Sequence, residues 1–146
     1  MRNIILLTAA LLISGCDGSG DREVVSTPDA PAAIGPYSHG IRVGKTLYLA
    51  GQIALDPATG KLVEGGIEAQ THRVLKNLGA VLKAGGFDYS HVVQVQVFVA
   101  DLNDYKVLND VYATYFNESK PARAVVEAAR IPRDALVEIM MVAVRP

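Results

Sequence analysis

The segment from Leu136 to Val144, near the end of the chain, is apolar at almost every position, and this pattern constrains the fold more than any other. In an extended strand, alternate side chains point to opposite faces of the sheet. One face would carry Leu136, Met140, Val142 and Val144, and the other Val137, Ile139, Met141 and Ala143. A strand that is apolar on both sides needs a sheet that is covered on both sides.

Two segments have the periodicity of helices. Apolar residues recur at helical spacing from Ile67 to Lys83, and the Gly85-Gly86 pair that follows is a common helix stop. A second helix is predicted to open at 101–104, where the Asp101 side chain can cap the first free amides. Its predicted buried stripe consists of Leu108, Val111, Tyr112, Tyr115 and Phe116.

Extended segments alternate with these helices. Strands are predicted at 41–43, 46–53 and 91–100, and residues 120–129 also read as extended. In the strand at 91–100, alternation is expected to place Val93, Val95, Val97 and Val99 together on one face.

The order of elements, β-β-α-β-α-β-β, predicts an α+β domain in which both helices pack on one face of a mixed sheet. The other face of the sheet also needs cover. In a protein of 146 residues, we expect that cover to be another copy of the chain.

The N-terminus has a different character from the rest of the chain. Met1-Arg2-Asn3 is followed by an apolar run, 4–13, that is too short to span a bilayer permanently and predicts an export signal. Ile13-Ser14-Gly15-Cys16 resembles the bacterial lipobox, in which the cysteine is lipidated and becomes the new N-terminus. A plain secretory signal is the alternative.

This interpretation divides the chain into three parts. Residues 1–15 are the expected signal peptide, 16–27 the lipidated Cys16 with a flexible tether, and 28–146 the folded domain. We therefore expect an exported, periplasmic lipoprotein. Asp17 resembles the signal that retains such proteins at the inner membrane, which is slightly favoured over the outer membrane.

Composition argues against several classes of function. A formal net charge of −1 and the absence of a basic stripe give no support for nucleic-acid binding. The histidines, His39, His72 and His91, lie on separate predicted elements, so no metal site is predicted. The glycine pairs at 65–66 and 85–86 match no nucleotide-binding fingerprint, and no cofactor is predicted.

Arg123 stands in an otherwise apolar extended segment and is the best indication of function. Alternation would place Arg123, Val125 and Glu127 on one face of that segment. A sheltered guanidinium cannot lose its proton, so it needs an anionic partner or an anionic ligand. The commonest explanation is a structural ion pair with Glu127 or Glu138, or a side chain that extends to water along its apolar stem; the other is a site for a carboxylate.

Two further residues are candidates for a site. Glu138 lies between Val137 and Ile139, where a carboxylate is costly unless it is paired or useful. Tyr37 ends a loop, 31–38, whose prolines and glycine restrict the backbone, so its side chain is expected to point in a defined direction. Glu138 could also simply be the partner of Arg123, and Tyr37 could anchor a strand.

Four motifs together resemble the RidA (YjgF-type) family, from about residue 26 to the end of the chain. They are Ala30-Pro31-Ala32-Ala33-Ile34-Gly35-Pro36-Tyr37-Ser38, Gly51-Gln52-Ile53, Val97-Phe98-Val99-Ala100-Asp101-Leu102-Asn103-Asp104-Tyr105 and Lys120-Pro121-Ala122-Arg123-Ala124-Val125-Val126-Glu127. The resemblance implies a chorismate-mutase-like α+β fold and a homotrimer with three clefts between subunits. It also implies hydrolysis of 2-imino acids, or their enamine tautomers, to 2-keto acids and ammonia.

The resemblance also assigns roles. Arg123 would clamp the substrate carboxylate, and Glu138 would orient the attacking water. Tyr37 and Asn109 would line the cleft, which backbone groups near Gly51 and Val125 would complete. The chemistry suits these side chains, because a guanidinium binds a carboxylate in bidentate form and one carboxylate can accept the proton of the water.

The sequence also departs from the family. Many members have serine at the position of Ala50 and cysteine at that of Val125, and most lack the N-terminal segment. Two alternatives to the deaminase therefore stay open: a trimer that binds small carboxylates without turnover, and a chaperone-like protein of the same fold.

Overall fold

Strand β6 (Val137–Val144), the segment that is apolar on both faces, lies inside a six-stranded sheet between β3 (Thr46–Ile53) and β4 (Val92–Val99). The computed structural model describes residues 21–146. The remaining strands are β1 (Arg22–Val25), β2 (Gly40–Val43) and β5 (Ala122–Glu127), and the order across the sheet is β1-β2-β3-β6-β4-β5. Among the strands of residues 21–146, β4 and β5 are the only neighbours that run parallel, so the sheet is mixed.

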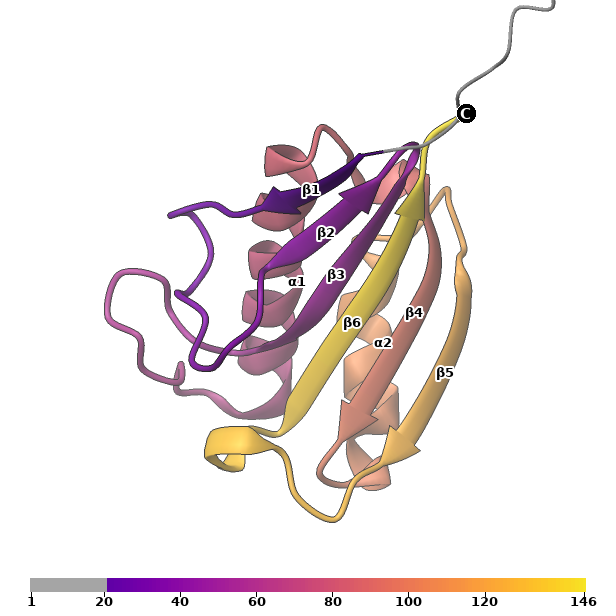
Figure 1. Cartoon of the computed structure of the whole chain (residues 1–146). Coiled ribbons are helices and arrows are strands. Elements are labelled where there is room, and N and C mark those ends of the chain that lie inside the picture. Colours follow the sequence, from indigo (N-terminus) through magenta and orange to yellow (C-terminus); the bar gives the residue numbers. More distant parts are fainter. Residues whose placement is uncertain (1–20) are drawn as a thin grey trace, which may run out of the picture.

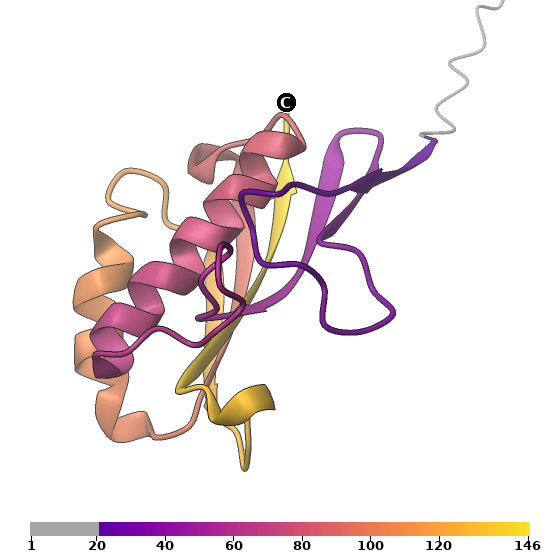
Figure 2. The ribbon, with the colours of Figure 1, turned by 90° about the vertical axis from the view of Figure 1, so that its left-hand side faces the viewer.

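Both helices, α1 (Gly66–Ala84) and α2 (Tyr105–Ala113), cover the same face of the sheet (Figure 1, and from the side Figure 2). The predicted α+β architecture is confirmed. No helix within residues 21–146 is long and apolar enough to cross a membrane.

Helix α1 begins and ends close to the predicted residues, whereas α2 ends at Ala113, so that Tyr115 and Phe116 of the predicted stripe lie in the turn after it. The stripe of α1 that faces the sheet includes Val74, Leu78 and Val81, all fully buried, and the helix stops at Gly85 before Gly86 at φ 79°. Asp101 Oδ1 accepts a hydrogen bond from the Asn103 amide at 2.8 Å, and so caps the short helix η2 (Leu102–Asp104) that leads into α2. Leu108, Val111 and Tyr112 are the buried residues of α2.

The two faces of β6 have different surroundings. Val137, Ile139, Met141 and Ala143 face the helices and are at most 1% exposed. Glu138, Met140 and Val142 point to the opposite face and are half-buried. On that face, Tyr48 of β3 is 52% exposed and Val126 of β5 is 47% exposed. As the sequence predicts, one chain leaves this side of the sheet apolar and uncovered.

The chain enters the sheet earlier than expected. Arg22–Val25 forms β1, which pairs antiparallel with β2, and Val25 joins the core while Glu23 forms an ion pair with Arg42. The prediction of a flexible tether through residue 27 is wrong for these residues. The reason is that Val24 and Val25 favour an extended strand, and that burial of Val25 stabilises the pairing.

A bulge changes the predicted faces of β4. The register against β6 shifts between Val92 and Gln94, so that Val92 is buried on the helix side and Val93 is exposed. The expectation that Val93 shares a face with Val95 is therefore wrong. The extra residue of a β-bulge reverses the alternation on one side of it.

Candidate functional site

Three of the predicted site residues, Tyr37, Gly51 and Glu138, line one pocket of about 240 Å³. Tyr37 comes from the loop before β2, Gly51 from the second half of β3, and Glu138 from the start of β6. Apolar side chains form the rest of the wall: Ile34, Ala50, Ile53 and Pro132. The pocket thus combines one carboxylate and one phenol with an apolar lining.

Among the described residues that line this pocket, Glu138 is the only acidic one, and it is half-buried. No hydrogen bond or ion pair to another side chain within residues 21–146 accounts for its burial, and desolvation raises the pKa of its carboxyl above the usual 4.5. A carboxylate that is partly desolvated and unpaired is a stronger proton acceptor than one in water.

A bulge in β3 brings Gly51 under this carboxylate. Leu49 pairs with Met141 and Gln52 with Ile139, so Ala50 and Gly51 together stand opposite Met140. A Cβ added at Gly51 would overlap Glu138 Oε1 and lie 3.0 Å from its Cδ. Any residue with a Cβ at this position would therefore displace the Glu138 carboxylate.

The loop that carries Tyr37 is held from both ends. The Ile34 amide donates to Tyr37 Oη at 3.3 Å, and the Tyr37 amide donates to the Gly35 carbonyl at 2.9 Å. These contacts fix the direction of the ring, as predicted, although Tyr37 remains 44% exposed.

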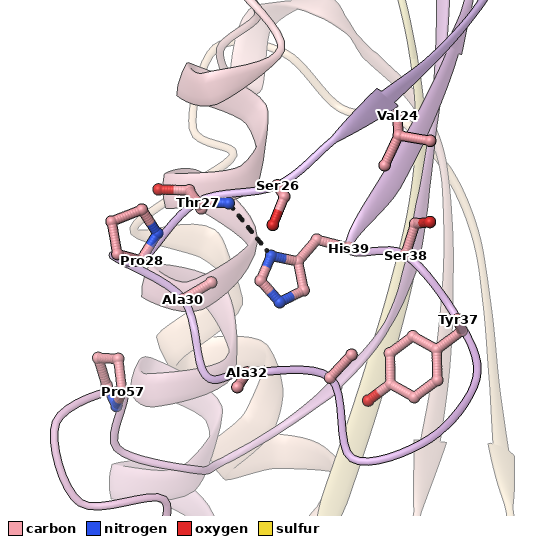
Figure 3. A pocket seen from close by; sticks show the side chains of 11 residues that line it. Val24, Ser26, Thr27, Pro28, Ala30, Ala32, Tyr37, Ser38, His39 and Pro57 are labelled. Atoms are coloured by element: carbon pink, nitrogen blue, oxygen red, sulfur yellow. Dashed lines mark hydrogen bonds between the residues drawn. The ribbon is translucent and has the colours of Figure 1, made fainter.

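Buried His39 fastens the base of the same loop (Figure 3). Its Nδ1 accepts from the Thr27 amide at 3.3 Å, and its Nε2 donates to the Pro31 carbonyl at 2.9 Å. Both ring nitrogens are used, which makes the role of His39 structural. A second pocket of about 550 Å³ opens beside it, and Tyr37 lines both pockets.

Arg123 and Asn109 form a second group. Arg123 Nη2 donates to Asn109 Oδ1 at 2.7 Å, and its guanidinium lies over the ring of Tyr112, with Cζ 4.5 Å from the ring centroid. The Tyr105 hydroxyl accepts a longer hydrogen bond from Nη2 at 3.5 Å. All these partners come from α2 and face β5.

The structural ion pair, the commonest explanation for Arg123, is not found. None of the ion pairs within residues 21–146 involves Arg123. Glu127 instead accepts a hydrogen bond from the Leu102 amide at 2.9 Å. The guanidinium therefore keeps a charge that nothing in the described part of the chain neutralises.

Arg123 and Glu138 point to opposite faces of the sheet. Arg123 is in register with Val95 of β4, which is paired with Met141, and both of these side chains are buried under the helices. Glu138 is in register with Phe98, three residues further along β4, on the uncovered face. One chain therefore cannot bring the guanidinium and the carboxylate to the same small ligand.

The remaining candidates divide in the same way. Val125 lies in register with Val97, partly buried against the core on the helix side, in a strand that forms one edge of the sheet. Cys16 lies outside the described residues. Within residues 21–146, no group of three or more His, Cys, Asp or Glu side chains could hold a metal ion.

The sequence missed the aromatic partners of Arg123. Tyr105, Asn109 and Tyr112 are spaced i, i+4 and i+7, which places them on one face of a helix. The sequence contains this spacing, but its apolar periodicity predicts Tyr112 only as a member of the buried stripe. Ile34, Ile53 and Pro132 were also not identified as pocket residues, since loop and strand ends meet there only in three dimensions.

The chain is similar to known proteins over most of its length. A sequence profile of the family described as Endoribonuclease L-PSP matches residues 27–145. The chain is 49% identical over 124 residues to the 2-iminobutanoate/2-iminopropanoate deaminase of Mus musculus, covering 85% of this chain and 92% of the mouse protein. It is 44% identical over 124 residues to the human protein of the same name, covering 85% of this chain and 90% of that protein.

Solved structures with the same fold support the comparison. RidA from the Antarctic bacterium Psychrobacter sp. is 39% identical, with a TM-score of 0.82 over 84% of this chain and 99% of that one. TdcF of E. coli, solved with bound serine, is 35% identical, with a TM-score of 0.82 over 85% of this chain and 99% of that one.

Proposed function

The chain belongs to the RidA/YjgF family, and on this premise we propose that it hydrolyses reactive 2-imino acids, or their enamine tautomers, to 2-keto acids and ammonia. The observation that carries the proposal is the unpaired, partly desolvated Glu138 carboxylate above Gly51 in a pocket that is otherwise mostly apolar. The names of the mouse and human relatives agree with this activity.

The reaction needs little machinery. Glu138 accepts a proton from a water molecule whose oxygen attacks the C=N carbon, which gives a carbinolamine. Glu138 delivers that proton to the imine nitrogen, which completes the carbinolamine. The carbinolamine hydroxyl then gives up its proton, through Glu138, to the amino nitrogen, the C–N bond breaks, and ammonia leaves as the 2-keto group forms. Arg123 binds the substrate carboxylate through two N–H groups and holds the carbon near the water.

The site is completed between subunits in this proposal. Arg123 and Glu138 face away from each other in one chain, so a ligand that touches both must lie between two copies. The uncovered apolar face of the sheet, with Tyr48 and Val126, is the surface on which copies assemble. We propose the homotrimer, in which each cleft combines Arg123 of one subunit with Glu138 of its neighbour.

Hydrolysis of RNA, which the name of the family profile suggests, is less consistent with the site. The pocket around Glu138 is lined by one acidic and several apolar side chains, and the chain has a formal charge of −1. A polyanion is repelled by the carboxylate and gains little from the overall charge.

Location is a separate proposal. We propose that the chain is exported and anchored by lipid on Cys16, in the periplasm, with the inner membrane favoured by Asp17. Residues 17–21 separate Cys16 from β1, and this length of extended chain spans at most about 18 Å. The folded domain would therefore stay close to the bilayer.

The site would face away from the membrane in that arrangement. Arg22 pairs with Val43 and Thr46 with Val144, so β1 begins at the end of the sheet where β6 finishes. Glu138 and its partner Ile53 lie at the opposite end of the β3–β6 pair, and Figure 1 shows β6 running from that end to the C-terminus. The pocket is then open to solutes rather than to lipid.

The decisive experiment generates 2-imino acids in situ with an amino-acid oxidase and compares their hydrolysis with and without purified residues 17–146. We expect hydrolysis above the buffer rate. Arg123→Ala should abolish hydrolysis and 2-keto acid binding together, while Glu138→Gln should suppress turnover about 100-fold and spare much of the binding.

Each alternative has its own outcome. Binding of 2-keto acids without hydrolysis would identify a carboxylate-binding protein. Neither binding nor hydrolysis would favour the chaperone-like function. Unfolding of Arg123→Ala would show that the arginine serves the fold.

A further inference from the structure

Helix α2 presents a stripe of neutral polar and aromatic groups to Arg123. Tyr105, Asn109 and Tyr112 recur every three or four residues, and their side chains meet the guanidinium of the neighbouring strand β5. Asn109 contacts one nitrogen, Nη2, at 2.7 Å, while the Tyr112 ring lies against the flat face of the group. The hydrogen bond to Asn109 thus restrains the guanidinium within its plane, and the ring of Tyr112 restrains it perpendicular to that plane.

None of these contacts removes the charge of Arg123. An amide oxygen, a phenol and an aromatic face are all neutral, and no carboxylate within residues 21–146 forms an ion pair with Arg123. Aromatic faces attract a guanidinium through their negative quadrupole. The arginine is therefore fixed in position and still free to bind an anion with its other N–H groups.

Tyr112 is suited to serve as a permanent neutral platform. Its ring is buried and stacks on Phe116 at 4.4 Å between centroids. Burial raises the pKa of the Tyr112 hydroxyl to about 12, and the charge of Arg123 lowers it by a smaller amount. The phenol therefore stays protonated at neutral pH. Its oxygen has no hydrogen-bond partner within the described residues, so the ring is what the site uses.

We propose that Asn109 and Tyr112, assisted by Tyr105, are positioning residues that hold Arg123 in the orientation required for the substrate carboxylate without neutralising it. The inference rests on the proposed role of Arg123 as the carboxylate clamp. It changes the expected role of Asn109, because its side-chain oxygen is committed to Arg123 at 2.7 Å instead of to the ligand.

Asn109→Asp gives the sharpest test, because it keeps the shape of the side chain and adds one negative charge. The new carboxylate forms an ion pair with Arg123 and competes with the ligand, so the Kd for 2-ketobutyrate should rise at least about tenfold. The thermal unfolding midpoint should stay the same or rise, which a merely structural role would not give. Asn117→Asp, in the loop after α2, is the control for added charge.

The platform is tested by Tyr112→Leu and Tyr112→Phe. Loss of the aromatic face should raise the Kd for 2-ketobutyrate, and the KM for the imine, about 2- to 30-fold with a smaller effect on kcat. Tyr112→Phe keeps the ring and should restore the affinity. Phe87→Leu removes a buried aromatic ring that pairs with His91 and Arg145 instead of Tyr112, and its affinity should not change.

The outcomes separate this inference from the proposed function. If Arg123→Ala does not weaken 2-ketobutyrate binding, the carboxylate clamp itself is wrong. If Arg123→Ala weakens binding but Asn109→Asp and Tyr112→Leu leave the Kd within twofold of wild type, only the positioning role is overturned. An equal loss of affinity in Phe87→Leu would also overturn it, since general loosening of the core would then be the cause.

Discussion

The Glu138 side chain lies so close to Gly51 that no residue with a Cβ fits beneath it unless the carboxylate moves. This contact depends on the bulge at Ala50 and Gly51, which places two residues of β3 opposite one residue of β6. The glycine and the acid are therefore one unit of the site. A larger residue in place of Gly51 should therefore displace the Glu138 side chain.

Gly51→Ala is expected to reduce imine hydrolysis at least about tenfold. The new methyl group occupies the place of Oε1 and pushes the carboxylate away from the position where it activates water. The fold should survive, because the displaced atoms are the end of a flexible side chain. Activity assays with circular dichroism check this, and in a Glu138→Gln background Gly51→Ala should cause little further loss. Unchanged activity would show that the position of the carboxylate is not critical.

The pH dependence of the reaction should report the burial of Glu138. A proton acceptor works only when ionised, so kcat/KM should fall as the pH drops through the pKa of Glu138. Because burial raises that pKa, the midpoint of the acidic limb should lie above 4.5. A pH–rate profile of the wild type checks the midpoint. A midpoint at or below 4.5 would argue against this residue as the base.

The same shift predicts the stability of Glu138→Gln. The folded-state pKa lies above that of the unfolded chain, so protonated Glu138 favours the fold at low pH, and this stability is lost as the pH rises through the folded-state pKa. At pH 7 the partly buried, ionised carboxylate lowers the free energy of unfolding, and a neutral glutamine does not. Thermal unfolding at pH 7 should therefore show an equal or higher midpoint for Glu138→Gln, and a lower one would indicate a partner that stabilises the charge.

Periodicity predicted the fold well because alternation within a strand and repetition within a helix are local properties. The apolar β6, the limits of α1 and the Asp101 cap all follow from residues close in sequence. Bulges are different. The register shifts at Val92–Gln94 and Leu49–Gln52 depend on which strands pair and on how the side chains pack.

The site was predicted as a set of residues but not as an arrangement. Arg123 and Glu138 stand out in the sequence because each lies in an apolar segment. Their separation onto two faces depends on the registers of β5 and β6 against β4, which no local pattern contains. The contact between Asn109 and Arg123 likewise joins residues on different elements.

Assembly should depend on the uncovered face of the sheet. Val126→Glu places a charge on that face, so the domain of residues 17–146 should dissociate to a monomer that keeps its secondary structure. Light scattering at micromolar concentration, with circular dichroism, measures both. Val107→Glu, on the exposed side of α2, is a matched control that should remain assembled. If Val126→Glu assembles like the wild type, another surface holds the copies together.

Lipid attachment is tested at Cys16. Cys16→Ser in the full chain should block processing or release the protein from the membrane fraction, because no thiol remains to carry the acyl chains. Fractionation followed by mass spectrometry of the mature N-terminus gives the answer. The domain of residues 17–146 should stay in the soluble fraction as a control. Membrane association that is unchanged in Cys16→Ser would leave only an ordinary signal peptide.

Mixing two inactive variants should restore activity if each site is shared between subunits. In a mixed oligomer of Arg123→Ala and Glu138→Gln chains, some clefts receive Arg123 from one variant and Glu138 from the other. When the chains mix at random, a cleft receives an intact Arg123 in about one half of cases and an intact Glu138 in about one half. About a quarter of the clefts are therefore complete, and about a quarter of the wild-type activity should return. Co-expression with two affinity tags isolates the mixed oligomers, and a mixture of the separately purified variants without exchange is the control. Because the two residues lie on opposite faces of one sheet, a site within a single chain is not possible without refolding. Mixed oligomers that remain as inactive as their parents would therefore mean that Arg123 and Glu138 do not act on the same substrate molecule.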